Sequence, residues 1–287
     1  MRLRFLTLFG VLFFLTGWLC AQAAWPVEAD RAASGVPPAF LYTSGSVPTP
    51  LPPSLSMADD VSLPPTIAVA LPRMAPELAL QAYRGRTIIQ AAQLSSYSAR
   101  TVISAELPDT HQYGEYELER HYSAPHQLAF KALGFTGDNF VKSNVILRLL
   151  QSEVDHVQKD DPALNAISPA NYKFSYKGTT QLGDRVVHVY QIKPREKRTG
   201  LFKGRIYLDV LSGSMVRAEG KLVKSPSLFV KKLEFVQDYA VVDSFTFPVH
   251  IHSEAQARIV GRAIVDIYHS DYQPVSNVSQ AKASPAL

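Results

Sequence analysis

The chain has 287 residues, of which 46% are hydrophobic and 10% aromatic, a composition that supplies a substantial core and excludes a globally disordered protein. Its formal charge is +4, and removal of Arg2 and Arg4 with the N-terminal signal described next leaves 27 basic residues (29 − 2) against 25 acidic ones. A balance this close to neutral, without interleaved basic and aromatic residues, excludes a nucleic-acid-binding module.

The first 23 residues have the pattern of a secretory signal. Arg2 and Arg4 provide the positive end, Phe5–Leu19 is apolar, and Ala21 and Ala23 form a small-residue cleavage site. The apolar stretch is shorter than the about 20 residues that a membrane-spanning helix needs. We therefore predict cleavage after Ala23 and an exported, soluble protein of the periplasm.

Cys20 offers an alternative N-terminus, in which this cysteine is acylated after cleavage just before it. The residues ahead of it are Trp18 and Leu19, whereas a bacterial lipoprotein signal has a small residue there, so the match is poor. In both cases the folded part contains no cysteine, and its stability has to come from core packing rather than disulfides.

A proline-rich segment follows the signal. Ten of the 20 prolines lie between Trp25 and Pro72, which predicts an extended, disordered linker over residues 24–75. Such a segment serves either as a tether between the folded domain and a membrane or partner, or as a plain disordered leader.

The folded domain is predicted over residues 76–272, followed by a disordered tail over 273–287. It begins with a helix from Pro76 to Ala92, in which Gly85 weakens the middle. Strands are predicted next at Tyr97–Leu107, Gly114–Ser123 and Gln127–Phe135.

The strongest helix signal runs from Asp138 to Gln158. Arg148 and Glu153 are expected outside its apolar stripe. The stripe consists of Val141, Val145, Ile146, Leu149, Leu150 and Val154.

Seven further strands are predicted after this helix. They are Tyr172–Lys177, Arg185–Lys193, Gly204–Val210, Met215–Leu222, Leu228–Tyr239, Thr246–Ala255 and Ile259–Tyr272.

Several of these strands, such as Arg185–Ile192, are apolar on both faces, which indicates that both faces of the sheet are covered. Ten antiparallel strands in hairpin succession either curl into a barrel or leave exposed edges. We therefore predict a mostly β, α+β fold: a curled antiparallel sheet that forms an incomplete, open β-barrel, with the two helices as a lid across its mouth.

The interior of such a barrel is expected to be apolar and to hold an apolar molecule, although ordinary core packing is the better explanation for any single residue. The predicted cavity set is Phe130, Phe135, Val187, Val189, Tyr207, Phe229, Phe235, Phe247, Ile251 and Ile267.

A basic stretch over residues 193–205 surrounds an apolar pair, Leu201 and Phe202. If the pair is exposed at a hairpin tip, the loop suits an anionic membrane surface or a partner. If it folds back, the loop is merely solvated. The residues predicted for this loop are Arg195, Lys197, Arg198, Leu201, Phe202 and Lys203.

Motifs for chemistry are weak. His250 and His252 share one strand face, with His269 and Asp266 as conceivable neighbours, but no second paired motif completes a metal site. Hydrolytic triads, zinc-protease helices and phosphate-binding glycine loops are missing from the sequence. We predict no metal, no cofactor and no enzymatic activity.

The order of these elements resembles the LolA/LolB/RseB group of periplasmic lipoprotein-handling proteins. The cues lie in Ile206–Asp209 followed by Ser212 and Gly213, in Phe235–Tyr239, and in Phe247–Pro248. The resemblance implies an open barrel whose apolar interior receives acyl chains, with helices acting as a lid. LolA itself has an arginine inside the barrel that holds the lid, and no residue of this sequence is matched to it.

From this resemblance we expect a monomeric carrier of acyl chains or lipidated protein cargo, in transient contact with membrane surfaces. Leu201 and Phe202 are the candidates for the exposed hydrophobic loop that LolB uses to deliver cargo. The alternative is an RseB-like regulatory or sensor module that binds a protein partner.

Overall fold

The computed structural model describes residues 72–159, 161–224, 230–258 and 261–277. The chain divides into two units, and all described residues belong to the unit that excludes 26–71. The predicted signal, Cys20 and Phe229 lie outside the described residues, as does the linker up to residue 71. No helix among the described residues is both long and apolar enough to cross a membrane.

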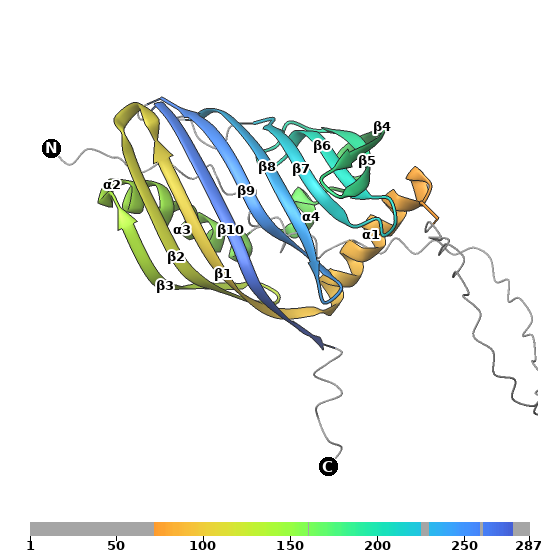
Figure 1. Ribbon diagram of the computed structural model, residues 1–287, viewed down its shortest axis with the longest axis horizontal. Helices are drawn as coiled ribbons and strands as arrows, with labels where there is room; N and C mark the ends of the chain where they lie inside the picture. Colours follow the sequence, from red (N-terminus) through yellow and green to blue (C-terminus); the bar gives the residue numbers. More distant parts are fainter. Residues whose placement is uncertain (1–71, 160, 225–229, 259–260, 278–287) are drawn as a thin grey trace, which may run out of the picture. The chain divides into compact units, whose positions relative to one another are not determined.

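Ten antiparallel strands form one open sheet (Figure 1). Their order is β3-β2-β1-β10-β9-β8-β7-β6-β5-β4, so β3 and β4 are the two edges and the sheet is not closed. The predicted fold class is confirmed. The strands are β1 (Leu94–Leu107), β2 (Gln112–Ser123), β3 (Gln127–Gly137), β4 (Tyr172–Leu182), β5 (Arg185–Pro194), β6 (Phe202–Asp209), β7 (Met215–Leu222), β8 (Val230–Val242), β9 (Phe245–Ala257) and β10 (Gly261–Ser276).

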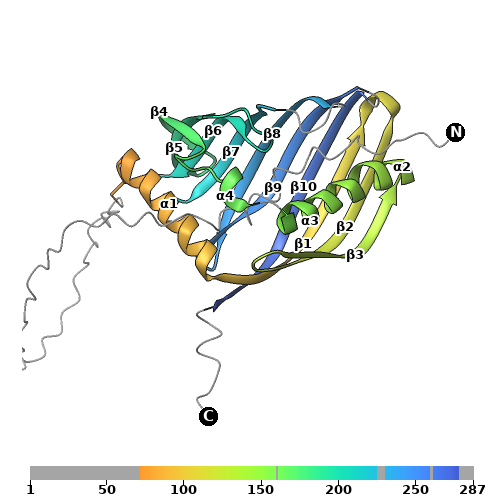
Figure 2. The same ribbon diagram turned by 180° about the vertical axis from the view of Figure 1, so that it is seen from behind.

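The helices lie on one face of this sheet, which we call the inner face (Figure 2). The predicted first helix is α1 (Pro76–Gln93). The predicted second helix is continuous but not uniform: α2 (Asn139–Val141) passes through a π-helical turn, η4 (Lys142–Ile146), into α3 (Leu147–Lys159). Two short helices, η3 (Pro108–Thr110) and α4 (Pro162–Asn165), were not predicted.

Strict alternation along the central strands directs one set of side chains to the inner face. On β1 and β10, for example, Ile103 and Ile267 are opposite each other and buried. Val145, Ile146 and Leu149 of the second helical segment join them in one apolar core. The sheet therefore has one fully covered face, and the core lies between this face and the helices.

Two boundaries differ from the predictions. β10 continues to Ser276, because residues 273–276 pair with the start of β1, so the predicted tail is wrong for these four residues. At the other end, Met74 belongs to the fold rather than to a disordered linker: its N–H donates to the Val210 carbonyl at 2.8 Å. Its own carbonyl lies 3.0 Å from Nε2 of His188.

Candidate functional site

The contact between α3 and the inner face contains a buried ion pair, Arg120 of β2 with Glu153 of α3. Only 3% of the Arg120 side chain and 2% of the Glu153 side chain are exposed. Nε of Arg120 also donates to the Tyr97 hydroxyl at 3.0 Å, and its guanidinium carbon lies 5.6 Å from the centre of the Phe130 ring. We call Arg120 and Glu153 the latch.

The prediction that Glu153 lies outside the helix stripe was wrong. Its position follows Leu149 and Leu150 by one turn, which places it on the buried side of α3. A carboxylate is buried there because a guanidinium on the sheet faces it. In β2 the signal was present: Arg120 alternates with Leu118 and Tyr122 and therefore points inward.

A buried histidine lies near the latch on β10. Nδ1 of His269 is 2.9 Å from the Thr101 hydroxyl. Burial, and secondarily the positive charge of Arg120, hold the pKa of His269 well below its usual value. The imidazole is therefore neutral at physiological pH. Among Arg120, Glu153, Thr101 and His269, only the two latch residues are charged.

Helix α1 is attached differently, by hydrogen bonds at both of its ends. At its start, the Tyr190 hydroxyl donates to the Pro76 carbonyl at 2.5 Å. At its end, the amide of Gln90 exchanges two hydrogen bonds with the backbone of Thr246, at 2.8 and 3.1 Å. In between, Nε of Arg86 donates to the Ser212 carbonyl at 2.9 Å.

The turn that receives α1 contains the sequence cue Ile206–Asp209, Ser212, Gly213. One carboxylate oxygen of Asp209 accepts from the N–H groups of Leu211 and Ser212 at 3.0 and 2.8 Å. Gly213 has φ of +68°, and a side chain there would collide with Ala82 of α1. This motif therefore fixes α1 against the sheet.

The predicted cavity residues lie on both faces of the sheet. The inner face carries Phe130, Phe135, Phe235, Phe247, Ile251 and Ile267, packed into the apolar clusters beneath the helices. Val187, Val189 and Tyr207 form a separate small cluster with Val216 on the opposite, outer face. The nine described residues of the set therefore do not line one cavity, because the alternation of β5 and β6 sends these three side chains outward.

The basic stretch does not end in an exposed apolar tip. Leu201 is completely buried and Phe202 is 3% exposed, with its ring 4.9 Å from that of Phe235. Arg195 and Arg198 turn back to donate to the carbonyls of Pro169 and Leu164. The expectation of a membrane-inserting Leu–Phe pair was wrong, and the alternative that it folds back onto the domain is correct.

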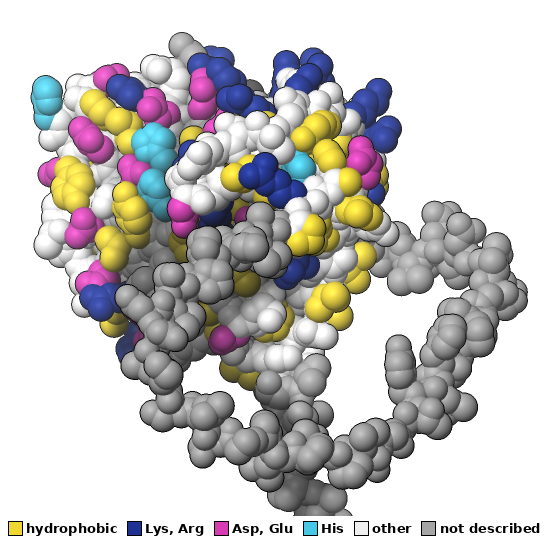
Figure 3. Space-filling model, turned by 45° about the vertical axis from the view of Figure 1, so that its right-hand side comes forward, with side chains coloured by type: hydrophobic (Ala, Val, Ile, Leu, Met, Phe, Trp, Pro, Cys, Tyr) yellow, Lys and Arg dark blue, Asp and Glu magenta, His cyan; other side chains and the backbone are white. Residues whose placement is uncertain are grey.

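Cationic side chains remain exposed around this end of the sheet. Lys197 and Lys203 are both exposed, and dark-blue side chains gather at the upper right of Figure 3, toward the end where Figure 1 draws β4, β5 and β6.

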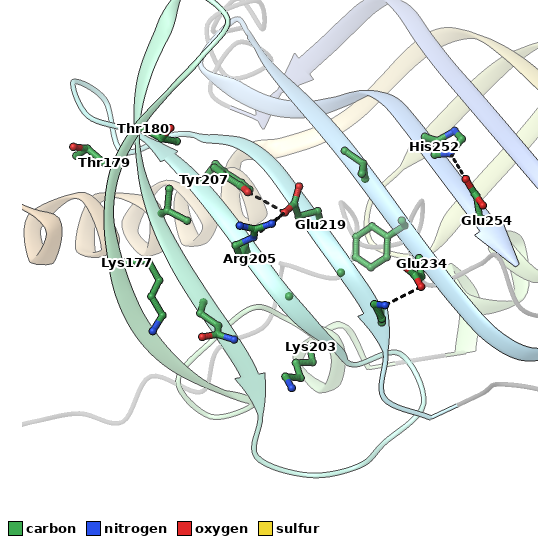
Figure 4. A pocket seen from close by; sticks show the side chains of 17 residues that line it. Lys177, Thr179, Thr180, Lys203, Arg205, Tyr207, Glu219, Glu234, His252 and Glu254 are labelled. Atoms are coloured by element: carbon green, nitrogen blue, oxygen red, sulfur yellow. Dashed lines mark hydrogen bonds and ion pairs between the residues drawn. The ribbon is translucent and has the colours of Figure 1, made fainter.

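An open groove of about 1110 Å³ lies on the outer face across β4–β9 (Figure 4). Strands β6 and β7 approach closely there at Gly204 and Gly220, where a side chain would overlap the facing backbone. One wall bears Glu219, which binds Arg205 at 2.7 Å and accepts from the Tyr207 hydroxyl at 2.9 Å. Most of the residues that line this groove are polar or charged, unlike those of the predicted cavity.

Burial raises the pKa of Tyr207 to about 12, with a further contribution from its hydrogen bond to Glu219. The phenol is therefore a neutral donor at physiological pH. Lys177 of β4 and Lys203 of β6 also line the groove, and they form no ion pair among the described residues.

His250 and His252 both lie beside Asp266, one of the two neighbours considered from the sequence. Nε2 of His250 and Nδ1 of His252 lie 3.0 and 2.9 Å from the same oxygen of Asp266. The Tyr268 ring stacks on His250 at 4.4 Å. His269 faces the inner side of β10 and is not part of this group. Within the described ranges, no cluster of three or more His, Cys, Asp or Glu side chains is arranged to hold a metal ion.

Comparisons with known proteins give only distant structural likenesses. No protein-family profile matches the chain, and no curated protein matches it in sequence. A DUF1329 family protein from Desulfovibrio piger is 10% identical, with a TM-score of 0.39 over 73% of this chain and 97% of the other. A LolA superfamily protein from Nitrosomonas europaea is 9% identical, with a TM-score of 0.34 over 69% and 92%.

A third match is MucB, 11% identical, with a TM-score of 0.24 over 71% of this chain and 95% of MucB. A LolA superfamily protein is thus among the solved structures that the chain resembles.

Proposed function

We propose that this protein is a periplasmic carrier that holds an acyl chain non-covalently between α3 and the inner face of the sheet. In this proposal α3 is a lid that opens and closes, and α1 stays fixed. The observation that carries the proposal is the latch, an ion pair buried where α3 packs on the sheet.

A buried ion pair adds little net stability, since the cost of removing two charges from water offsets their attraction. Apolar residues of similar size at the positions of Arg120 and Glu153 would hold α3 at least as firmly. The pair therefore favours a contact that has to open: on separation both charges are hydrated, which partly compensates for the apolar surface that becomes exposed.

The other contacts of α3 fit a lid. Besides the latch, a hydrogen bond from His126 ties the end of α3 to the sheet side: Nδ1 of His126 lies 3.0 Å from the Val157 carbonyl. The π-helical turn before α3 is a local departure of the kind often found at functional sites. Phe140 and Leu147, on either side of this turn, are exposed. By contrast, α1 is held by hydrogen bonds at both ends.

Burial of methylenes supplies the affinity for such a ligand. Each methylene transferred from water contributes about 0.8 kcal/mol, so a long acyl chain binds without charged recognition groups. Side chains fill the inner face when α3 is closed, and the ligand would replace the packing between α3 and the sheet. No cofactor or covalent step is needed.

Native mass spectrometry of the exported, mature protein, purified without detergent, tests this proposal. We expect an added mass of several hundred daltons or more, lost in organic solvent, and its return when phosphatidylethanolamine is added. A bare protein mass that stays bare with added phosphatidylethanolamine would contradict the carrier proposal.

The second candidate function is an RseB-like module that binds a protein partner. One observation favours it: β3 is an edge strand, which pairs with β2 along one edge and with no described strand along the other. Leu133 on β3 is half exposed. Edge strands offer unpaired backbone groups to another chain. Recovery of one stoichiometric periplasmic protein with the exported protein, together with a lipid-free mass, would favour this function over the carrier.

A further inference from the structure

The outer face carries four lysines that lie opposite one another on four adjacent strands. Lys173 of β4 pairs with Lys193 of β5, and Lys203 of β6 pairs with Lys221 of β7. Lys193 and Lys203 directly follow the last residue pair of β5 and β6, so the register aligns them as well. Neighbouring strands are about 4.8 Å apart, so this lysine row extends about 14 Å across the sheet.

The alternation of the strands places the lysine row on the outer face. Tyr172, Ile192 and Phe202, each of which is next to a lysine of the row in the sequence, are buried in the inner core. Because successive side chains of a strand point to opposite faces, the lysines point outward. All four are exposed to solvent.

The lysine row is poorly neutralised. Lys221 binds Glu234 at 2.9 Å, but the same carboxylate oxygen also binds Lys232 of β8. The other three lysines of the row form no ion pair within the described ranges of the chain. Like charges directly opposite each other destabilise a sheet. The row therefore costs the fold stability, and an anion that binds from outside would remove this repulsion.

The outer groove of about 1110 Å³ crosses β4–β9, in the same direction as the lysine row (Figure 4). Lys203 and Lys221 of the row line the groove, and Lys177 of β4 adds another exposed cation to its lining. A concave site that extends across several strands suits an elongated molecule, whereas a flat lipid surface would not enter it.

The remaining polar groups of the groove suit a ligand that has hydroxyl groups. The hydroxyls of Thr179 and Thr180 and the amide of Gln191 both donate and accept hydrogen bonds. The carboxylates of Glu219 and Glu254 only accept. Sugar hydroxyls can bond to all of these groups, whereas an anion without donors would be repelled by the two carboxylates.

A polypeptide is less well suited to this groove. Protein partners obtain most of their binding energy from apolar and aromatic anchors that fill pockets. Among the apolar side chains that line the groove, Val189, Tyr207 and Phe235 are each less than 10% exposed. They therefore offer little surface on which such an anchor could pack.

We propose that the outer groove binds a linear acidic polysaccharide, with its acidic groups on the lysine row and its hydroxyls on the polar groups of the groove. This is a second binding site, on the face of the sheet opposite α3. It goes beyond the proposed carrier function and does not depend on it.

The test titrates a fluorescently labelled oligogalacturonide, a linear chain of uronic acids, against the exported protein and follows anisotropy. We expect binding that weakens as the salt concentration rises, because the contacts are exposed charges. The methyl-esterified oligogalacturonide keeps its hydroxyls but has no carboxylates, and it should not bind. Failure of the charged oligosaccharide to bind, or equal binding of its ester, would overturn the proposal.

The variant Lys173→Gln/Lys193→Gln/Lys203→Gln removes the three unpaired cations of the lysine row. Each exposed ion pair contributes up to about fivefold to affinity, so the triple variant should bind at least about tenfold more weakly. In low salt it should be as stable to urea as the native protein or more so, because the repulsion is gone. A loss of stability would mean that the lysines serve the fold, which would overturn the proposal.

The matched control is Arg100→Gln/Lys131→Gln/Lys159→Gln, which removes three exposed cations from β1, β3 and α3, outside the groove. It should bind the oligogalacturonide as the native protein does. An equal loss in the control would show attraction to net charge only and would overturn the site.

Two further probes separate other classes of partner. If polyglutamate binds as tightly as the oligogalacturonide, the site takes acidic polypeptides and the proposal is wrong. Binding to phosphatidylglycerol vesicles that depends on the lysine row, without binding of the oligogalacturonide, would assign the row to a membrane surface instead. All of these outcomes leave the carrier proposal intact, since that proposal is tested by the lipid mass.

Discussion

Replacement of the latch acid by leucine should destabilise the protein strongly. In Glu153→Leu, Arg120 stays charged at a site where it is 3% exposed. Arg120 keeps its contacts with the Tyr97 hydroxyl and the Phe130 ring, and neither of these groups is an anion. Removing one partner of a buried pair typically costs about 3–5 kcal/mol, and we expect a loss of free energy of unfolding in that range.

The double variant Arg120→Met/Glu153→Leu separates the cost of an unpaired charge from the worth of the pair. With both charges gone, we expect the free energy of unfolding to return to the native value or to exceed it by up to about 4 kcal/mol. The same double variant should open less often, which would appear as slower amide hydrogen exchange in α3. The isosteric Glu153→Gln should have the opposite effect on exchange.

Urea denaturation at constant pH, followed by circular dichroism, measures these free energies. The control is the pair on the outer face: Arg205 is 57% exposed, so Arg205→Met and Glu219→Leu should each change stability by about 1 kcal/mol or less. If Glu153→Leu costs no more than these controls, water reaches the latch and the reasoning from its burial is wrong. If it fails to fold, Glu153→Gln provides the measurement.

Three further outcomes can be measured by the same denaturation assay. The folded-state pKa of His269 is depressed, so its contribution to the free energy of unfolding is present above the unfolded pKa of about 6.5. That contribution is lost as the pH falls below about 6.5, by up to about 1.4 kcal/mol per pH unit. His269→Gln should reduce this dependence of stability on pH, and an unchanged dependence would contradict the assignment. Gly85→Ala, in open space within α1, should stabilise the protein by about 0.5–1 kcal/mol. Gly213→Ala should destabilise it by about 1–3 kcal/mol. Equal effects would show that the turn at Gly213, against which α1 packs, tolerates a side chain. Phe202→Ala should cost about 3–5 kcal/mol, and the exposed Phe140→Ala about 0.5 kcal/mol or less; similar costs would place Phe202 outside the core.

The sequence predicts the sheet well, since a period of two residues is a strong signal wherever one face is buried. All ten strands were located, and the long apolar repeat of 138–158 located the second helix. Strand ends were predicted less accurately: β4 runs to Leu182 rather than Lys177. The residues after Lys177 pair with β5, but they are mainly polar and exposed and therefore lack the apolar alternation of a half-buried strand.

The site was harder to predict, because it depends on pairs of residues distant in the sequence. Glu153 reads as a solvent-facing charge until Arg120, 33 positions earlier, is placed opposite it. The second apolar face of β5 suggested a ligand cavity, but its residues Val187 and Val189 form a small cluster with Tyr207 and Val216 on the outer face.

Photo-crosslinking most directly tests the claim that an acyl chain binds under α3. The mature protein would be incubated with a phosphatidylethanolamine that carries a diazirine in its acyl chain, irradiated and mapped by peptide mass spectrometry. We expect labels on α3 and on inner-face residues such as Ile251 and Ile267, and fewer of them when Arg120→Met/Glu153→Leu holds the lid closed. Labels confined to the outer groove, around Val189 and Tyr207, would contradict the account.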